Sequence, residues 1–403
     1  MSQHSHNNHN GYNSNNLRNN TTSLSIFTSA RHNDTTIATT STTAAAASSN
    51  NSHNSNDFAY PDWQLTFIFL ICGLIILITI LGNILVCTAV AIVRKLRTPS
   101  NLLIVSLAVS DLLVALLVMP FALVYEAKGC WIFGQTACDV WTSLDVFLCT
   151  ASILNLCVIS VDRYFVITRP FQYAMKRTPL RMTCMIVFVW LLSALISIPP
   201  MFGWKEDPKK DHCNITQNIG YQFYATIGAF YLPLLVMVTI YYRIYRVSSR
   251  IAEAEARSKP NNCQLQQPHQ SHSNSLSLTP SRQQSQSQQS QQSSNLSKEC
   301  KATKTLGVIM GTFIACWLPF FILALIKPFC HSSDACIPHW LNALFLWLGY
   351  ANSFLNPIIY ARFNREFRKP FREILLFRCL GINRRLRFDT YAEQYGPTSQ
   401  DRL

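Results

Sequence analysis

The chain has 403 residues, of which 49% are hydrophobic and only 13% are charged, and its formal net charge is +14. Soluble domains usually carry about a quarter charged residues, and the apolar residues here collect in long blocks, which excludes an ordinary soluble protein. The basic residues flank these blocks and no soluble basic domain carries them, which argues against a nucleic-acid-binding protein.

Residues 1–63 are dominated by Asn, Ser, Thr and His and contain few apolar side chains. Such a composition cannot bury a core, so we expect a disordered segment. It contains Asn-x-Ser/Thr sequons, which are predicted to carry glycans because the segment is expected outside the cell. The sequon asparagines are Asn19, Asn20, Asn33 and Asn50.

Seven mostly apolar blocks follow, each long enough to cross roughly 30 Å of hydrocarbon as an α-helix. A backbone in lipid must satisfy its own hydrogen bonds, so helices are expected, and internal prolines should kink them. The predicted fold is an all-α membrane protein, a seven-transmembrane helix bundle over residues 64–360. The blocks are Leu65–Val93, Asn101–Tyr125, Val140–Val161, Met182–Trp204, Gly220–Tyr242, Thr305–Ile326 and Trp340–Tyr360, and their prolines include Pro120, Pro233, Pro319 and Pro357.

Basic residues predict the orientation of the bundle. They follow the first block at Arg94, Lys95 and Arg97, and recur in the second connection and after Tyr360. By the positive-inside rule these parts are cytoplasmic, so we expect a multi-pass plasma-membrane protein with an extracellular N-terminus and contacts to membrane lipid. The third connection, about residues 250–298, is rich in Gln and Ser and is expected to be disordered. Residues 361–403 should form an amphipathic helix and a cytoplasmic tail.

Two cysteines stand at the expected outer surface, Cys138 at the end of the third block and Cys213 in the loop before the fifth. The outside is oxidising, so we expect a disulfide between them. Cys330 and Cys336 flank a short outer loop and could form a second one. Cys130 is left without a partner.

Asp145 is a carboxylate inside the third block, where a charge costs roughly 2.5–3.5 kcal/mol on insertion scales. It lies about two helical turns from Cys138, and no Lys or Arg in any predicted span can neutralise it. One interpretation is a carboxylate that faces a cavity and binds a cationic ligand. The other is a structural carboxylate that accepts hydrogen bonds from neighbouring hydroxyls. The residues alone leave both open.

Asp111 is the other carboxylate within the blocks and lies near the middle of the second one. Ser152, Asn352, Ser353 and Asn356 supply polar groups at compatible depths. These oxygens could hold a sodium ion, which would be the only cofactor. The alternative, favoured by the residues alone, is a hydrogen-bonded network without an ion.

Asp162, Arg163 and Tyr164 follow one another at the inner end of the third block, and Glu299 precedes the sixth. A pair between Arg163 and Glu299 would hold two helix ends together, and its opening would expose a cytoplasmic cleft, as signalling proteins require. The alternative is an arginine that only reaches toward the membrane surface.

The residues from Leu65 to Cys379 resemble the rhodopsin-like family of G protein-coupled receptors. The resemblance rests on an ordered set of motifs that falls on all seven blocks. The motifs are Gly82-Asn83, Leu107-Ala108-Val109-Ser110-Asp111, Asp162-Arg163-Tyr164, Trp190, Pro233 with Tyr241, Cys316-Trp317-Leu318-Pro319 and Asn356-Pro357-Ile358-Ile359-Tyr360.

The resemblance implies roles for residues that composition does not identify. It favours the sodium interpretation of Asp111, and it places an amphipathic eighth helix at Phe363–Phe377 with a palmitoylated Cys379. Phe171 would contact the G protein together with Arg163. The residues implied in the activation switch are Asp162, Arg163, Tyr164, Glu299, Tyr241, Ile153, Pro233, Phe313, Asn356, Pro357 and Tyr360.

Asp145 matches the position at which the biogenic-amine receptors of this family keep their ammonium-binding aspartate, and Tyr350 matches the tyrosine that donates to it. Aromatic residues of the sixth block would form a wall for a flat ring. The ligand-binding residues implied by this match are Asp145, Val146, Cys149, Thr150, Ile215, Ala225, Thr226, Ala229, Trp317, Phe320, Phe321, Trp347 and Tyr350.

The fifth block narrows the ligand, because Thr226 keeps a hydroxyl where Ala225 and Ala229 lack one. One hydroxyl suits a ligand whose ring carries a single hydroxyl group, as the rings of serotonin, tyramine and octopamine do. Cys149–Ile153, Ile198–Trp204 and Phe345–Ser353 are similar to segments of the subtype-seven serotonin receptors, which couple to the stimulatory G protein and raise cyclic AMP. Arrestin and receptor kinases are further partners implied by the family. The Asn- and Gln-rich flanks suggest an invertebrate member.

Other functions remain as alternatives. Tyramine, octopamine or dopamine could replace serotonin as the ligand. A membrane transporter is a more distant alternative, since such proteins usually show internal repeats that this chain lacks. An enzyme is the least favoured alternative, because no nucleophile, metal cluster or phosphate-binding loop is found in a soluble segment. Asn214 lies in a sequon, but Ile215 should fold over the ligand, so we expect Asn214 to carry no glycan.

Overall fold

The computed structural model describes residues 61–204, 213–258, 307–330 and 337–395. All of them belong to one compact unit, Asn54–Leu403. Within these ranges the regular structure is helical, with no strand. Six helices are long and apolar enough to cross a membrane: Asp62–Ile92, Pro99–Lys128, Gln135–Thr168, Pro179–Ser197, Ile219–Arg250 and Gly307–Phe329. The prediction of an all-α membrane bundle is thereby confirmed.

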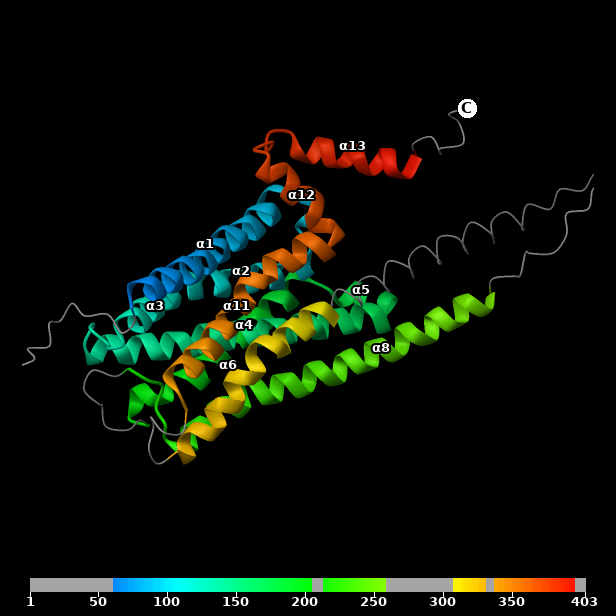
Figure 1. Ribbon diagram of the computed structural model, residues 1–403. Coiled ribbons are helices and arrows are strands. Elements are labelled where there is room, and N and C mark those ends of the chain that lie inside the picture. Colours follow the sequence, from blue (N-terminus) through cyan, green and yellow to red (C-terminus); the bar gives the residue numbers. More distant parts are fainter. Residues whose placement is uncertain (1–60, 205–212, 259–306, 331–336, 396–403) are drawn as a thin grey trace, which may run out of the picture. The chain divides into compact units, whose positions relative to one another are not determined.

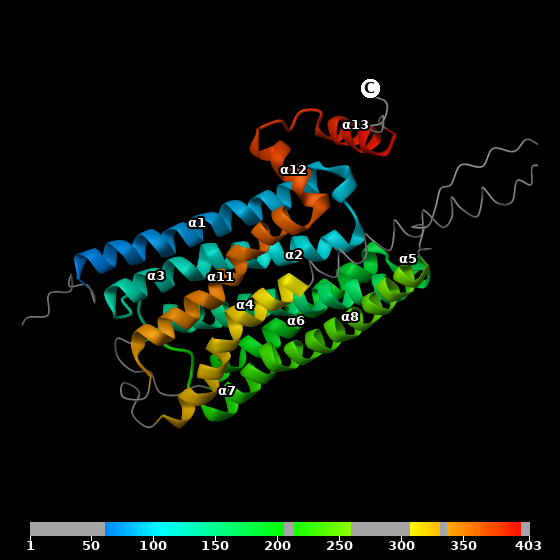
Figure 2. The ribbon, with the colours of Figure 1, turned by 45° about the vertical axis from the view of Figure 1, so that its right-hand side comes forward.

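The seventh helix, α11 (His339–Phe363), is less apolar than the six, because its inner face carries Asn352, Ser353 and Asn356. It packs along α1 (Asp62–Ile92). Figures 1 and 2 show both helices side by side with α2 (Pro99–Leu113), which packs in turn on α4 (Gln135–Thr168). The polar residues of α11 therefore face the inside of the bundle, where Asn352, Ser353 and Asn356 are buried.

Helix α4 is the centre of the bundle. It packs against α2, α6 (Pro179–Ser197) and α8 (Leu232–Ser258), and the middle of its length, Leu148–Leu156, is continuously buried. Trp190 of α6 donates to Ser106 of α2 at 3.1 Å, which ties these neighbours together. Because α4 is central and runs the length of the bundle, it can supply side chains to sites at both ends.

Two spans contain a wider π-helical turn just before a proline. The second span runs through α2, η2 (Val114–Val118) and α3 (Met119–Lys128), and Pro120 lies in the first turn of α3. The fifth runs through α7 (Ile219–Thr226), η4 (Ile227–Tyr231) and α8, and Pro233 follows η4. Proline lacks an N–H and clashes with the carbonyl four residues earlier, so the wide turn accommodates it without ending the helix.

Helices α1 and α11 approach closely at Gly82. A side chain there would place its Cβ 2.8 Å from Cγ of Pro357. Asn83, the next residue, donates to the backbone oxygen of Ser353 at 3.3 Å. The glycine therefore permits the contact and the asparagine fixes it.

Some helix boundaries differ from the predicted ones. The fourth span ends at Ser197 and continues as the 3-10 turn η3 (Pro199–Phe202), because two consecutive prolines cannot extend the α-helix. The predicted eighth helix is α12 (Arg365–Leu375), whose start is capped by Asn364. Two helices were not predicted: α5 (Pro170–Lys176) in the second connection and α13 (Ile382–Tyr395) after α12.

Candidate functional site

A disulfide closes one end of the bundle. Cys138, in the first turn of α4, is bonded to Cys213 in the segment before α7, as predicted. Cys330 lies in the described part, but its proposed partner Cys336 lies outside the described residues, so that bridge stays a prediction. Cys130 is a free thiol. The disulfide holds residues 213–217 against a cavity that opens between the helices at this end.

The cavity collects side chains from α3, α4, α7, η4, the sixth span, α11 and the segment at Cys213. Every ligand-binding residue expected from the sequence lines it except Tyr350. Tyr350 is fully buried behind the wall and donates its hydroxyl to Asp145 Oδ1 at 3.1 Å. The structure thus brings the whole predicted set to one place.

Asp145 has few partners for a buried charge. Its side chain is 6% exposed, and the Cys149 thiol donates to the same Oδ1 at 3.3 Å as Tyr350 does. Within the described ranges no hydrogen bond reaches Oδ2 and no Lys or Arg forms an ion pair with Asp145. A buried carboxylate in this situation favours a cation from outside the chain.

The walls around Asp145 suit a flat aromatic group. Trp317 and Phe320 of the sixth span make an edge-to-face pair with ring centroids 5.9 Å apart, and Phe321 stacks on Phe230 at 4.3 Å. The rings give large, rigid apolar surfaces. Ala225, Thr226 and Ala229 also line the cavity, and of these three only Thr226 carries a hydroxyl.

Several lining residues were missed, and all of them except Gln217 lie near the span ends on the side of the Cys138–Cys213 disulfide. On α11 the family resemblance implied Trp347 and Tyr350, and the helical spacing of four residues leads from these to Ala343 and Leu346. The residues that were not identified as cavity lining are Ala122, Tyr125, Glu126, Trp141, Gln217, Gln222, Leu323, Ala324, Lys327, His339, Asn342, Ala343 and Leu346.

The mouth of the cavity is more polar than its floor. Glu126 of α3 and His339 of α11 approach to 3.6 Å. Lys327 also lines this cavity, although it falls one residue beyond the predicted sixth block. One lysine therefore lines the same cavity as Asp145, which the predicted spans did not indicate. No ion pair joins Lys327 to Asp145 in the described part of the chain.

Asp111 is completely buried and accepts three hydrogen bonds. Ser152 and Ser353 donate to Oδ1 at 2.6 and 2.8 Å, and Asn356 donates to Oδ2 at 2.8 Å. Asn352 was expected in the same group, but its buried amide nitrogen has no hydrogen-bond partner in the described structure. The predicted oxygens of Asp111, Ser152 and Ser353 are therefore together, while Asn352 is next to the group on the sequence without bonding to it.

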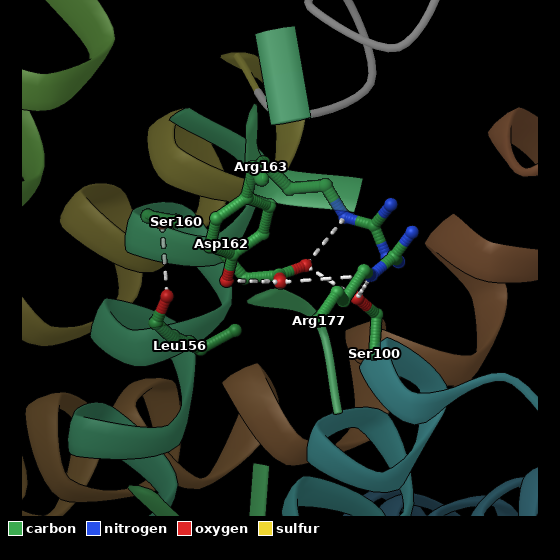
Figure 3. Close-up of polar contacts among 7 residues, drawn as sticks. Ser100, Leu156, Ser160, Asp162, Arg163 and Arg177 are labelled. Atoms are coloured by element: carbon green, nitrogen blue, oxygen red, sulfur yellow. Dashed lines mark hydrogen bonds and ion pairs between the residues drawn. The ribbon is translucent and has the colours of Figure 1, made fainter. Parts of the chain in front are cut away.

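The opposite end of the bundle holds a second polar cluster, around Asp162 (Figure 3). Ser100 and Tyr173 donate to its two carboxylate oxygens at 2.7 and 2.9 Å. Two guanidinium groups approach it, Arg163 Nε at 3.9 Å from Oδ2 and Arg177 Nε at 3.9 Å from Oδ1. Asp162 is only 1% exposed, so its charge is shared between two cations.

The remaining residues of the predicted switch lie along the path between the two ends. Ile153 lines the floor of the cavity, and Phe313, fully buried, packs on Phe230 with ring centroids 5.6 Å apart. The hydroxyl of Tyr241 packs against Gly307, where a Cβ would come within 2.6 Å of it. Tyr360 is buried and packs on Phe367 of α12.

Some predicted residues remain untested. Glu299 and the sequons Asn19, Asn20, Asn33 and Asn50 lie outside the described residues, as does most of the third connection. The side chain of Phe171, in α5, is also outside the described set. Cys379 is an exposed free thiol, and its palmitoylation stays a prediction.

The chain matches the family model described as 7 transmembrane receptor (rhodopsin family) over residues 82–360. It is 45% identical to 5-hydroxytryptamine receptor 1 of Drosophila melanogaster, an alignment that covers 76% of this chain and 64% of that protein. It is 42% identical to 5-hydroxytryptamine receptor 7 of Xenopus laevis, over 81% of this chain and 80% of that protein. It is 39% identical to 5-hydroxytryptamine receptor 1A-alpha of Takifugu rubripes, over 77% and 87%.

Proposed function

The chain belongs to the rhodopsin family of seven-transmembrane receptors, and on that premise we propose that it is a receptor for serotonin that activates the stimulatory G protein and raises cyclic AMP. It is therefore a multi-pass membrane receptor and not an enzyme. The family and its similar relatives, which are named as 5-hydroxytryptamine receptors, support a protonated amine as the ligand and a G protein as the partner.

The observation that carries the proposal is the position of Asp145. It lies in the wall of an aromatic cavity, it accepts hydrogen bonds only on Oδ1, and it has no Lys or Arg partner in the described part of the chain. The ammonium group of serotonin would supply the missing positive charge. The indole would lie between the aromatic side chains of the sixth span, and its hydroxyl would meet Thr226.

The two ends of the bundle then have different environments. The cavity and its disulfide open to the outside of the cell, where disulfides persist. The cluster around Asp162 faces the cytoplasm, together with the basic residues of the connections. Arg163 and Phe171 are the residues that would contact the G protein. Arrestin and receptor kinases would bind the same side.

A sodium ion is proposed at Asp111. The residues fit a cation, because Asp111 is fully buried, no Lys or Arg in the described ranges pairs with it, and the hydroxyl oxygens of Ser152 and Ser353 lie at its carboxylate. A monovalent ion there would neutralise Asp111. If the ion binds only the inactive arrangement, it shifts the population toward that arrangement and thereby lowers the affinity for agonists.

A ligand panel tests the proposal. Cells that express the chain are given serotonin, tyramine, octopamine and dopamine, and cyclic AMP is measured against untransfected cells. Serotonin should be the most potent and should raise cyclic AMP. If dopamine, tyramine or octopamine is more potent than serotonin, the proposed ligand is wrong. If serotonin lowers cyclic AMP, the proposed coupling to the stimulatory G protein is wrong.

A further inference from the structure

The carboxylate of Asp162 lies between two arginines that come from different elements. Arg163 is its neighbour on α4, whereas Arg177 follows α5 in the connection to α6. Each Nε lies 3.9 Å from a different oxygen of the carboxylate, so the two arginines approach the group from separate sides. Their side chains are 30% and 26% exposed, so water reaches both arginines to a similar extent.

Arg177 is held in place by more than its charge. Its Nε also donates to the hydroxyl of Ser100 on α2, and that hydroxyl donates to Asp162 (Figure 3). Arg163 makes no such hydrogen bond within the described ranges. Arg177 is therefore anchored to the bundle, whereas Arg163 is the more easily released of the two.

The surroundings of Arg177 are consistent with a fixed charge. Burial lowers the pKa of its guanidinium, and the charge of Asp162 offsets only part of that shift. Tyr173, which donates to the same carboxylate, has its pKa raised to about 12 by burial and by Asp162, so it stays a neutral donor. An arginine keeps its charge under all ordinary conditions. The group around Asp162 is thus balanced by Arg177 even without Arg163.

We infer that Arg177 is the counter-charge that neutralises Asp162 when Arg163 leaves it, and that it thereby makes the release of Arg163 possible. Arg177 is a positioning residue that acts through Asp162. The functional part of this inference rests on the proposed receptor function, because the release of Arg163 is read out as signalling. Its electrostatic part does not, because charge sharing changes the stability of the protein itself.

Thermal unfolding of the purified receptor tests the charge sharing without any ligand. Arg163→Gln and Arg177→Gln should each lower the melting temperature only slightly, since the other arginine still neutralises Asp162. The double variant should lose about 2 °C more than the sum, because it leaves a buried carboxylate uncompensated. Additive losses would overturn the inference whatever the ligand is.

Signalling provides the second readout. Arg177→Gln should lower both agonist-free and serotonin-stimulated cyclic AMP by about fivefold at matched surface expression, the shift expected for a partly exposed ion pair. Lys176→Gln, one residue earlier and exposed without an ion pair in the described structure, is the matched control and should leave both unchanged. Arg177→Lys should restore part of the response, since it restores the charge.

Asp162→Asn separates an action through Asp162 from a direct contact with the G protein. In that background Arg177→Gln should have no further effect. An equal loss in both backgrounds, or a rise in agonist-free signalling with Arg177→Gln alone, would contradict the inference. A parent receptor that responds to no amine would instead contradict the proposed function, and the unfolding experiment would then decide the inference by itself.

Discussion

Helix α4 carries two buried carboxylates near its two ends, and they differ in what surrounds their charge. Asp145 accepts hydrogen bonds from the neutral groups of Tyr350 and Cys149, both on one oxygen. Asp162 accepts hydrogen bonds on both oxygens and lies beside the guanidinium groups of Arg163 and Arg177. The two are seventeen positions apart in the sequence, about 26 Å along an α-helix.

The difference shows how one helix can serve two purposes. A carboxylate whose protein partners are neutral can bind a cation that comes from outside the protein. A carboxylate that already has two cations can exchange one of them, which makes it suitable for a switch. The residue type and the burial are the same at both sites, so only the neighbours distinguish a binding group from a switching group.

The largest effect is expected from removing the charge in the cavity. Asp145→Asn keeps the shape and both neighbours but removes the partner of the ligand ammonium. Loss of a buried charge partner costs about 3–5 kcal/mol, so serotonin affinity should fall by about two to four decades. Competition binding at matched surface expression measures it, with Asp162→Asn as the comparison that should keep ligand binding. Undiminished binding by Asp145→Asn would refute an amine site at this position.

Thr226→Ala tests the one hydroxyl that Ala225, Thr226 and Ala229 contribute to the cavity. Removal of one hydrogen bond should weaken serotonin by about tenfold. Tryptamine lacks the ring hydroxyl and should bind both receptors equally well, which makes it the internal control. If both ligands lose the same affinity, the hydroxyl of serotonin lies elsewhere.

Tyr350→Phe tests the hydrogen bond that the buried Tyr350 hydroxyl donates to Asp145. The change removes a donor 3.1 Å from Oδ1 but no lining surface. Serotonin affinity should fall by about fivefold, the worth of about 1 kcal/mol. The same change in the Asp145→Asn receptor should have little effect, because the donor acts through the carboxylate; an equal loss in that background would show that the tyrosine acts in another way.

Glu299→Ala is expected to give the smallest effect and concerns the switching end. If Glu299 pairs with Arg163 in the inactive arrangement, its loss frees an arginine near water, worth about 1 kcal/mol. Agonist-free cyclic AMP should rise several-fold, and agonists should bind somewhat more tightly, because both follow from one shift of populations. Unchanged agonist-free signalling at matched expression would leave Asp162 as the main partner of Arg163.

The sequence predicted those features that depend on residues close together in the chain. Long apolar blocks predict spans wherever they occur. A carboxylate inside a span led to Asp145, two cysteines at the expected outer surface led to the Cys138–Cys213 bond, and the family resemblance led to Tyr350; the structure brings all of them to one end. Even so, the residues alone left a structural role for Asp145 open, because the absence of a cationic neighbour depends on how the helices pack.

Features that depend on packing were missed. Arg177 was interpreted only as one of many basic residues that set the orientation, because nothing in the sequence shows that its connection folds onto Ser100 and Asp162. Helix α13 was missed because it is fixed by distant groups: the side chain of Asn383 accepts from the backbone of Arg94 at 2.9 Å and donates to Ile92 at 3.1 Å. Contacts across almost 300 residues leave no local signal.

A structure of the receptor with serotonin bound tests the central claim most directly, through the distance from the ligand ammonium nitrogen to the carboxylate of Asp145. The account predicts an ion pair within hydrogen-bond distance, about 2.7–3.1 Å, on an oxygen that Tyr350 and Cys149 leave available. A bound serotonin whose ammonium lies elsewhere, with Asp145 still bonded only to its neutral neighbours, would contradict it.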